Sequence, residues 1–521
     1  MTNIQKEEEW DAIIIGSGMG GMACGSALAH YGKKVLILEK HYVAGGMTHT
    51  FKRKKHFTWD VGVHALGEMG ENRLPGKIIS WLSQDKVKMN KYGDVYDTFF
   101  FPENFKFELP SSIDEYKENL LKAFPEEKKA IELYFEMVQQ AGKSAKVHFF
   151  CRNMAKWAET LATPFLKGKL NNWIKLTTKE VLDELTSNEK LKAVLAGQWG
   201  YYGSPPSRSS FFIHAITIRH FWEGAYYPEG TSKTLADNIL NIVHEKGGDV
   251  RLRTAVDKVL TEGGKVIGVR TAKGENIYAP LVVSAAGAKA TVERLLPETE
   301  EQKKWATNIK GLSQSPCHLC VYLGFEGDIK KAGATASNQW FFNSWDQEKT
   351  LWDFKNKDEE PHILYVSFPS LKDPAHYSGD SNYHTGEVVT FVDWDYFLKW
   401  EETKQGRRGE DYKDLKEELT KRIIDHLKTH LPDLMKLCTY VELSTPLSTD
   451  HFCSSPRGAI YGLEPTPERF NCKDLRPQTP LKNFYLTGAD VGTLGVVGAL
   501  MGGVLTAAKI DKRIFSKIKG K

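Results

Sequence analysis

The chain has 521 residues, of which 41% are hydrophobic, and a net charge of +4 at pH 7. This length can bury a large core and suggests two or three domains, and the nearly balanced charge demands no nucleic-acid partner. Seven cysteines are an odd number, which disfavours a complete disulfide framework and favours a reducing compartment. The first nine residues have no apolar core. We therefore expect neither a signal nor a transit peptide, and a cytoplasmic protein, either free or peripheral on a membrane.

The stretch from Trp10 to Gly46 predicts a nucleotide-binding fold. Its three isoleucines, 13–15, form the short apolar run of a buried strand. Gly16, Gly18 and Gly21 then fit the dinucleotide fingerprint. In that motif one glycine allows a tight turn, one lets the backbone approach a pyrophosphate, and one lets the next helix pack on the strand. The N-terminal end of that helix is positive and favours phosphate.

Two features after that helix extend the expected site. Glu39 ends the second strand, where an acid accepts a hydrogen bond from a ribose hydroxyl. Gly45 and Gly46 follow within a few residues. Because glycine lets backbone pack against a ligand, we expect the chain to cross close to the cofactor a second time.

Residues 103–187 show helical periodicity, and one part of them is strongly basic. Residues 143–179 carry eight lysines and arginines against one acid, Glu159, with aromatic and aliphatic side chains between them. This composition suits a membrane surface with anionic lipids, and it suits a solvated helical face over a core equally well. Nucleic acid is a poorer match, because no nucleic-acid fold signature accompanies the charge.

The middle of the chain reads as short strands joined by glycine turns. Residues 249–279 contain four such strands, with Gly263-Gly264 as a hairpin signal. Residues 281–287 form another buried strand that ends in small residues. We expect this strand to return to the nucleotide sheet, which predicts a discontinuous domain.

No metal site is predicted. Cys317 and Cys320 form the single Cys-x-x-Cys pair, but they lie in a predicted strand and would point to opposite faces. There is no second pair to complete a zinc site.

The C-terminal region contains a third segment typical of a cofactor site. A strand ends in Thr487-Gly488-Ala489-Asp490 and leads into an uncharged run, 491–508. Five glycines interrupt this run, so we interpret it as a buried helix over a cofactor rather than a membrane span. The basic tail, 509–521, has isoleucines at helical spacing and is either a surface anchor or a solvated end.

Four further segments carry a family resemblance: His41–Phe51, Trp59–His64, Ser367–Pro374 and Leu494–Ala499. Together with the nucleotide motifs they resemble the FAD-dependent oxidoreductases of the amine oxidase and phytoene desaturase superfamily. Within it the chain is most similar to the retinol saturase (all-trans-retinol 13,14-reductase) branch and its carotenoid isomerase and desaturase relatives. The likeness runs along nearly the whole chain.

The resemblance implies an α/β fold, in which a Rossmann-like FAD-binding domain is interleaved with an α+β substrate domain. The FAD-binding domain would comprise 8–100, 222–310 and 446–510. The domain for a lipid substrate would comprise 101–221 and 311–445, followed by the basic tail 511–521.

The resemblance also implies a set of cofactor contacts. Glycines would meet the pyrophosphate, Glu39 the adenosine ribose, Val256 the adenine, and Asp490 the ribityl–pyrophosphate side of the flavin. The expected FAD-binding residues are Gly16, Gly18, Gly21, Glu39, Gly45, Gly46, Met47, Val256, Gly287, Gly488, Asp490 and Val497. Met47 is a departure, because amine oxidases often carry Arg there, and it argues against an amine substrate.

The implied chemistry is two-electron transfer at the carbon–carbon double bonds of a hydrophobic polyene, either retinoid or carotenoid-like. Reduction of such a bond needs a hydride from the flavin and a proton from an acid. His64 is the first candidate for that acid, because histidine can donate near neutral pH. His49 and Tyr461 are the weaker candidates.

Several alternatives remain open from the sequence. A desaturase or a cis–trans isomerase would use the same site, and an amine or amino-acid oxidase would share the fold. A non-catalytic lipid carrier could retain a vestigial flavin site. No second dinucleotide fingerprint is present. A reductase would therefore take electrons from NAD(P)H bound without that motif, or from a partner protein.

Overall fold

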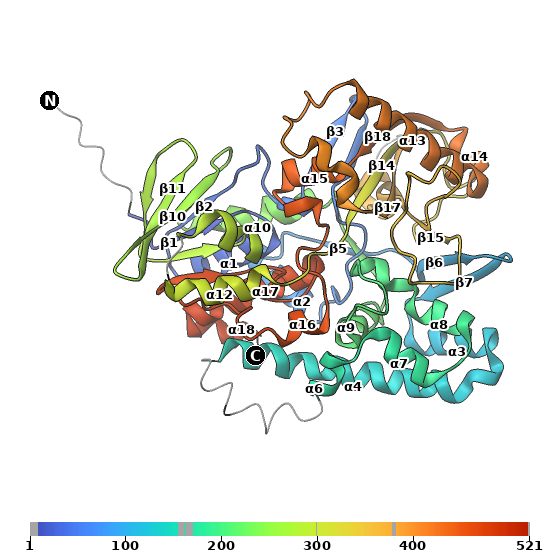
Figure 1. Ribbon diagram of the computed structural model, residues 1–521, viewed down its shortest axis with the longest axis horizontal. Coiled ribbons are helices and arrows are strands. Elements are labelled where there is room, and N and C mark those ends of the chain that lie inside the picture. Colours follow the sequence, from blue (N-terminus) through green and yellow to red (C-terminus); the bar gives the residue numbers. More distant parts are fainter. Residues whose placement is uncertain (1–8, 155–160, 162–169, 298–299, 378–381, 519–521) are drawn as a thin grey trace.

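The computed structural model describes residues 9–154, 161, 170–297, 300–377 and 382–518. A five-stranded parallel sheet lies at the centre of its nucleotide-binding part (Figure 1). Ile13 pairs with Leu36 on one side and with Val282 on the other. In sheet order the strands are β19 (Phe484–Leu486), β13 (Val282–Ser284), β1 (Ala12–Ile15), β2 (Val35–Leu38) and β9 (Asp249–Arg251). Strands from three distant parts of the sequence thus join one sheet, which confirms the predicted return of residues 281–287.

Both faces of this sheet are covered. Ile14 and Ile37 face one side, where they pack against helices α1 (Met19–His30), α10 (Lys233–Glu245) and α17 (Gly495–Ile510), with α2 (Leu74–Ser83) alongside. Ile13 and Leu36 face the other side. They pack there against α12 (Glu300–Lys310) and a three-stranded sheet of β10 (Val256–Glu262), β11 (Lys265–Thr271) and β12 (Asn276–Tyr278). Glu262 pairs with Lys265, which confirms the Gly263-Gly264 hairpin.

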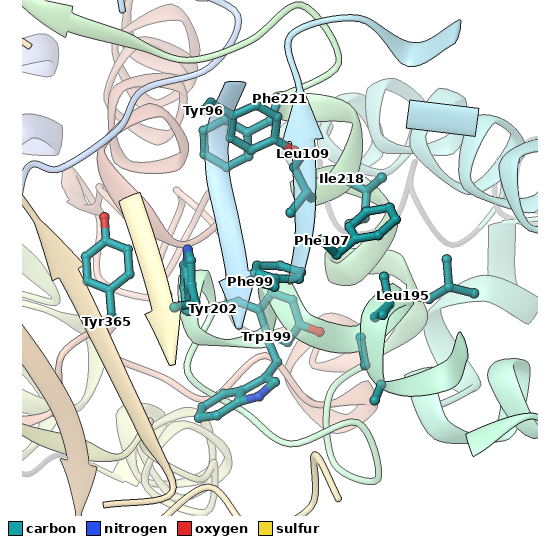
Figure 2. Packing of buried hydrophobic residues seen from close by; sticks show 14 of the residues in the cluster. Tyr96, Phe99, Phe107, Leu109, Leu195, Trp199, Tyr202, Ile218, Phe221 and Tyr365 are labelled. Carbon is teal, nitrogen blue, oxygen red and sulfur yellow. The ribbon is translucent and has the colours of Figure 1, made fainter. Parts of the chain in front are cut away.

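A seven-stranded mixed sheet forms the second half of the molecule. In sheet order its strands are β18 (Cys438–Ser444), β14 (Cys317–Glu326), β17 (Tyr383–Val392), β16 (Ile363–Ser367), β15 (Asn338–Phe342), β6 (Val95–Phe101) and β7 (Phe105–Pro110). Leu319 and Val321 face α13 (Glu410–His430), whose Leu419 and Ile423 complete that core. The opposite face is rich in aromatic side chains, and Figure 2 shows Phe99 and Trp199 within it.

Helices from the 103–220 region cover this aromatic face: α3 (Ile113–Ala123), α4 (Lys128–Asn153), α7 (Thr178–Leu185), α8 (Glu189–Ala196) and α9 (Phe211–His220). Two small strand pairs lie between the halves: β3 (Thr50–Arg53) with β4 (Phe57–Asp60), and β5 (Met89–Lys91) with β8 (Tyr226–Pro228). Among the described residues, the other α-helices are α6 (Leu170–Lys175), α11 (Ala288–Ala290), α14 (Pro432–Met435), α15 (Pro446–Cys453), α16 (Pro467–Asn471) and α18 (Phe515–Ile518).

The isoleucines of the basic tail pack inward. Ile514 is fully buried, and Ile510 and Ile518 are partly buried against the same core as α1 and α17. The helical spacing of these isoleucines therefore reflects internal packing, and a membrane-facing role for the tail stays a prediction.

The division into domains stays a prediction, with one point of difference at its first boundary. The sequence assigned residues up to 100 to the FAD-binding part, whereas Val95–Phe101 is hydrogen-bonded into the seven-stranded sheet as β6. The sequence did not reveal this pairing because residues 97 and 338 are far apart in the chain, and such long-range strand pairing leaves no local pattern.

The basic stretch 143–179 is only partly visible in the structure. Its residues 155–160 and 162–169, which include Trp157 and Phe165, lie outside the described residues. A membrane-facing role for the stretch stays a prediction. Across the described parts of the chain, no helix has the length and apolar character needed to cross a bilayer.

Helices α1 and α17 cross at glycines, and this contact leaves no room for side chains. A Cβ on Gly503 would lie 2.6 Å from the Gly20 carbonyl oxygen and 2.7 Å from the Ala23 Cβ. We expect Gly503→Ala to lower the free energy of unfolding by about 1–3 kcal/mol, because overpacking forces backbone apart. Thermal melts of the purified protein measure this loss.

Gly311→Ala is the matched control, since a Cβ there would lie 3.4 Å from the Thr307 carbonyl oxygen at an exposed helix end. We expect it to change stability by less than about 0.5 kcal/mol. Equal melting temperatures for the two variants would contradict the packing argument.

Candidate functional site

One cavity of about 670 Å³ opens at the carboxyl edge of the five-stranded sheet. Open α/β sheets bind ligands at this edge, where turns after several strands meet. Most of the lining comes from five segments far apart in the sequence: 15–20, 38–49, 285–295, 452–463 and 487–499. Residues 61–64, 254–257 and 314 contribute further lining side chains. From the other half of the molecule, β14 and β17 close one end of the cavity with His318, Cys320 and Val389.

The fingerprint glycines divide into two kinds. Gly16 has a positive φ of 95°, and a Cβ on Gly21 would lie 2.0 Å from the Gly16 carbonyl oxygen. These two glycines shape the turn. Gly18 lines the cavity, and a Cβ built on it would meet no protein atom within 4 Å. The backbone at Gly18 therefore faces space that a ligand can fill, at the N-terminal end of α1.

The double glycine lies directly against this loop. Gly45 and Gly46 have φ values of 117° and 56°, and a Cβ on Gly46 would lie 2.9 Å from the Gly18 Cα. Gly46 and Met47 line the cavity, whereas Gly45 and Gly21 lie outside the lining. The predicted second crossing near the cofactor loop is thus present in the geometry.

Glu39 lies at the end of β2 and lines the cavity. Its carboxylate accepts hydrogen bonds from the Ser17 backbone N–H (2.9 Å), the Ser17 hydroxyl (2.6 Å) and the His41 backbone N–H (2.8 Å). These bonds hold the acid beside the fingerprint turn, and a carboxylate has further lone pairs for a ligand hydroxyl.

Asp490 closes the opposite wall. Its Oδ2 accepts from the Ala288 backbone N–H (2.7 Å) and its Oδ1 from the Leu463 backbone N–H (3.1 Å). Three further residues of the expected FAD-binding set also line the cavity: Val256, Gly287 and Gly488. Val497 lies outside the lining, where its neighbours Gly495, Val496 and Ala499 are found instead.

All three candidates for the proton donor line the cavity. His49 donates from Nδ1 to the Gly46 carbonyl (2.5 Å), and burial lowers its pKa. The Tyr461 hydroxyl donates to the Gly200 carbonyl (3.1 Å), and burial raises its pKa well above its usual range. His64 places Nδ1 2.7 Å from Oε2 of Glu387. Burial and the nearby Lys372 ammonium lower the pKa of His64 to about 3, so its imidazole is neutral at physiological pH.

Sequence reasoning missed two further lining residues on β14. His318 and Cys320 face the cavity, while Cys317 packs on the opposite face with the α13 core. The two cysteines thus point to opposite faces, as the strand period predicted. Nδ1 of His318 is buried without a hydrogen-bond partner among the described residues, and burial lowers the pKa of this histidine to about 4. The same alternation could have revealed His318, because it shares the face of Cys320.

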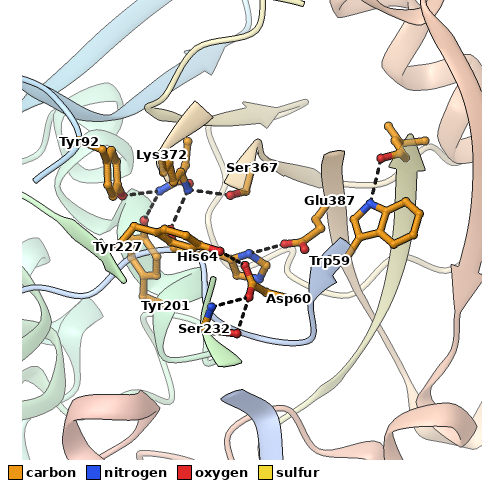
Figure 3. A network of polar contacts seen from close by, with 12 residues as sticks. Trp59, Asp60, His64, Tyr92, Tyr201, Tyr227, Ser232, Ser367, Lys372 and Glu387 are labelled. Atoms are coloured by element: carbon orange, nitrogen blue, oxygen red, sulfur yellow. Dashed lines mark hydrogen bonds and ion pairs between the residues drawn. The ribbon is translucent and has the colours of Figure 1, made fainter. Parts of the chain in front are cut away.

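A buried polar network lies behind His64 (Figure 3). Lys372 donates from Nζ to the His64 carbonyl (2.7 Å), to Asn338 Oδ1 (2.5 Å) and to Ser367 Oγ (2.7 Å). Burial lowers the pKa of Lys372 to about 7. Buried polar groups of this kind must be paired to be tolerated, and three donors of Lys372 are used.

Two carboxyl groups belong to the same network. Asp60 accepts from the Tyr227 hydroxyl and from the Ser232 backbone N–H (3.1 Å), and burial, together with Glu387, raises its pKa to about 6. Glu387 is fully buried on β17. The signal in the sequence was a single acidic residue directly before the apolar run 388–392.

The comparisons with known proteins now decide the family. A family model described as flavin containing amine oxidoreductase matches residues 19–511. The chain belongs to this family. It is accordingly a flavin-dependent oxidoreductase, and the fold class predicted from the sequence is confirmed.

Similarity to individual proteins narrows the family membership. A zebrafish protein named all-trans-retinol 13,14-reductase is 31% identical over 526 residues, which span 97% of this chain and 86% of the relative. Another zebrafish protein, named inactive all-trans-retinol 13,14-reductase, is 28% identical over 96% of this chain and 86% of that relative. A carrot protein named prolycopene isomerase, chloroplastic, is 23% identical over 97% of this chain and 80% of its own length. The resemblance to the retinol saturase and carotenoid isomerase branch is thereby confirmed.

Solved structures support the same fold. Cyclohexylamine oxidase from Brevibacterium oxydans superposes with a TM-score of 0.63 over 98% of this chain and 99% of that chain, at 15% identity. This likeness concerns the fold alone. The cavity fits a flavin nucleotide: its glycine loop is open to a ligand at Gly18, and His318 has an unpartnered buried nitrogen at the far end.

The Gly18 geometry yields a direct test of the flavin site. Gly18 has φ −60°, so alanine fits its backbone, and the added methyl would occupy ligand space. We expect Gly18→Ala to leave the melting temperature of flavin-free protein unchanged and to weaken flavin binding about 10- to 100-fold. Flavin titration by fluorescence measures the affinity. Wild-type affinity in Gly18→Ala would contradict the assignment of this loop as the phosphate site.

Proposed function

We propose that this protein is an FAD-dependent reductase of carbon–carbon double bonds in a polyene lipid, retinoid or carotenoid-like. The observation that carries the proposal is the end-to-end similarity to a protein named all-trans-retinol 13,14-reductase. A shared family alone would not choose a substrate, because the same fold also serves amine oxidases.

The chemistry of the lining residues favours a polyene over an amine. An ammonium substrate calls for a free carboxylate. The acids among the lining residues are Glu39, Asp257 and Asp490. Glu39 and Asp490 accept backbone hydrogen bonds, and Asp257 is paired with Arg270 (3.0 Å). Neutral histidines with Val61, Val389 and Ile460 surround the other end, which suits an uncharged, apolar ligand.

Each predicted cofactor residue has a proposed role. The 16–18 loop and the N-terminus of α1 would hold the pyrophosphate of FAD, and Glu39 would accept from the ribose. Asp490 would orient the ribityl side, and Val256 would contact the adenine. When bound, FAD supplies two-electron transfer. The chain's own part is to bind it, exclude water from the histidine end and hold a proton at His64.

A cis–trans isomerase is the second candidate, because the similarity to prolycopene isomerase spans nearly the whole chain. Isomerisation changes neither the mass nor the hydrogen content of the polyene, whereas reduction adds two hydrogens. One similar protein is named inactive all-trans-retinol 13,14-reductase, so similarity alone does not establish turnover. Turnover must therefore be measured directly for this chain.

The first experiment identifies the cofactor and the direction of reaction. We expect the purified protein to carry FAD that dithionite can reduce. Under anaerobic conditions, all-trans-retinol or a carotene should then reoxidise the reduced FAD and be converted to a product heavier by two hydrogens. Addition of NADPH or NADH in place of dithionite tests the proposed donor. Reduction of the oxidised flavin by putrescine or another amine, with release of hydrogen peroxide in air, would contradict the proposal. Lipid binding without any flavin reduction would instead indicate a carrier.

His64 gives the proposal a residue-level test. We expect His64→Ala to keep its FAD and to slow polyene-dependent flavin reoxidation by about 10²–10⁴-fold, the range for a lost acid–base group. Stopped-flow absorbance measures the rate. His244→Ala, at an exposed position near the end of α10, is the control and should match the wild type. Full turnover in His64→Ala would remove this histidine from the mechanism.

A further inference from the structure

Glu387 occupies an unusual position for a carboxyl group. It lies in the middle of β17, opposite Tyr322 on β14 and Ser367 on β16, and its side chain is fully buried. Residues alternate along a strand, so Glu387 shares its face with Val389, which lines the cavity. The carboxyl group is therefore held on the cavity side of the sheet, one layer behind the lining.

The neighbour of this carboxyl group is a lining residue. Oε2 of Glu387 lies 2.7 Å from Nδ1 of His64, and the dashed line in Figure 3 joins them. Among the described residues, no side chain donates a well-aligned hydrogen bond to either Glu387 oxygen. Lys372 is close enough to act electrostatically, but its donors are directed to the His64 carbonyl, Asn338 and Ser367.

Both members of this pair are driven to their neutral forms. Burial of a carboxylate is costly, and it raises the pKa of Glu387 well above its usual range, although the Lys372 ammonium and the Asp60 backbone amide act in the opposite direction. Burial lowers the pKa of His64 at the same time. A protonated carboxyl donates from oxygen, and the neutral imidazole then accepts at Nδ1 and carries its hydrogen on Nε2.

We propose that Glu387 is the proton-holding partner of His64: it fixes the imidazole with its hydrogen on Nε2 and passes its own proton to Nδ1 when His64 protonates the substrate. The inference rests on the proposed function and deepens it, because a neutral imidazole alone is a weak acid. Glu387 acts through His64 and is a positioning residue, whereas His64 lines the cavity.

The step balances in atoms and electrons. A C–H bond forms at one alkene carbon from the Nε2 proton, and the other carbon receives the hydride equivalent of the reduced flavin. The Glu387 O–H bond breaks as the Nδ1–H bond forms, so His64 remains neutral. Glu387 is left as a carboxylate near the Lys372 ammonium. Before the next turnover Nε2 of His64 takes a proton from water in the cavity and the Nδ1 proton returns to Glu387, which restores both starting forms.

Glu387→Gln separates the two parts of the role. Its amide N–H can still donate to Nδ1 and hold the tautomer, but it cannot give up a proton. We expect Glu387→Gln to retain FAD and to slow polyene-dependent flavin reoxidation about 10²-fold, and Glu387→Asp to recover part of the rate. Combining Glu387→Gln with His64→Ala should add little to His64→Ala alone, since the two residues act as a unit.

Asp97→Asn is the matched control. Asp97 is a fully buried acid on β6 that accepts from Asn338 (2.8 Å) and the Tyr201 hydroxyl (2.8 Å), and it lies outside the cavity lining. We expect Asp97→Asn to keep the wild-type rate within a few-fold. Wild-type turnover in Glu387→Gln would overturn the inference, because it would exclude proton donation by Glu387. An equal loss of rate in both variants would also overturn it, because it would indicate a general cost of altering buried acids.

A spectroscopic measurement tests the proton without turnover. Burial raises the pKa values of Asp60 and Asp97 to about 6, so both are ionised at about pH 8, where Glu387 should still be protonated. We expect the infrared spectrum of the wild-type protein at that pH to contain the C=O band of a protonated carboxyl, and Glu387→Gln to lack it. A wild type without this band would overturn the inference about Glu387. A wild type with the band that reduces no polyene would overturn the proposed function and the transfer step with it.

Discussion

The close approach of backbone to backbone at the carboxyl edge of the five-stranded sheet is the constraint on which both fold and site depend. A Cβ on Gly20 would lie 2.3 Å from the Gly488 Cα, and one on Gly21 would lie 2.0 Å from the Gly16 oxygen. The first contact joins the first strand–helix unit to the turn after the C-terminal strand, more than 460 residues later in the sequence, and the second closes the turn between β1 and α1. The turns that close around the cavity are therefore the same turns that pack the core.

Burial of titratable groups plays the corresponding role at the other end of the cavity. The seven-stranded sheet brings Glu387 to His64 and places Lys372 against the His64 carbonyl. Burial shifts the pKa of each of these groups toward its neutral form. The protonation states that follow, a neutral histidine beside a protonated carboxyl, suit a site that must deliver one proton to an apolar substrate.

Much of this architecture could be predicted from the sequence, because local patterns encode it. Short local patterns of a few residues predict the fingerprint turn, the returning strand before Gly287 and the Gly263-Gly264 hairpin. The pairing of strands that are distant in the sequence is not encoded in any local pattern. The placement of β6 beside β15, and of Glu387 behind His64, depends on register across more than 200 residues. The isoleucines of the tail show that even a clear local pattern can be ambiguous. Their helical spacing does not distinguish a core face from a surface anchor.

The central claim is that this flavoenzyme reduces a polyene, with the proton delivered through the protein. Anaerobic single turnover in D₂O, followed by mass spectrometry and NMR of the product, tests it most directly. The account predicts a dihydro product in which the carbon that accepts the proton carries one solvent-derived deuterium. A polyene recovered with its original mass and an altered double-bond geometry would contradict the claim and identify an isomerase.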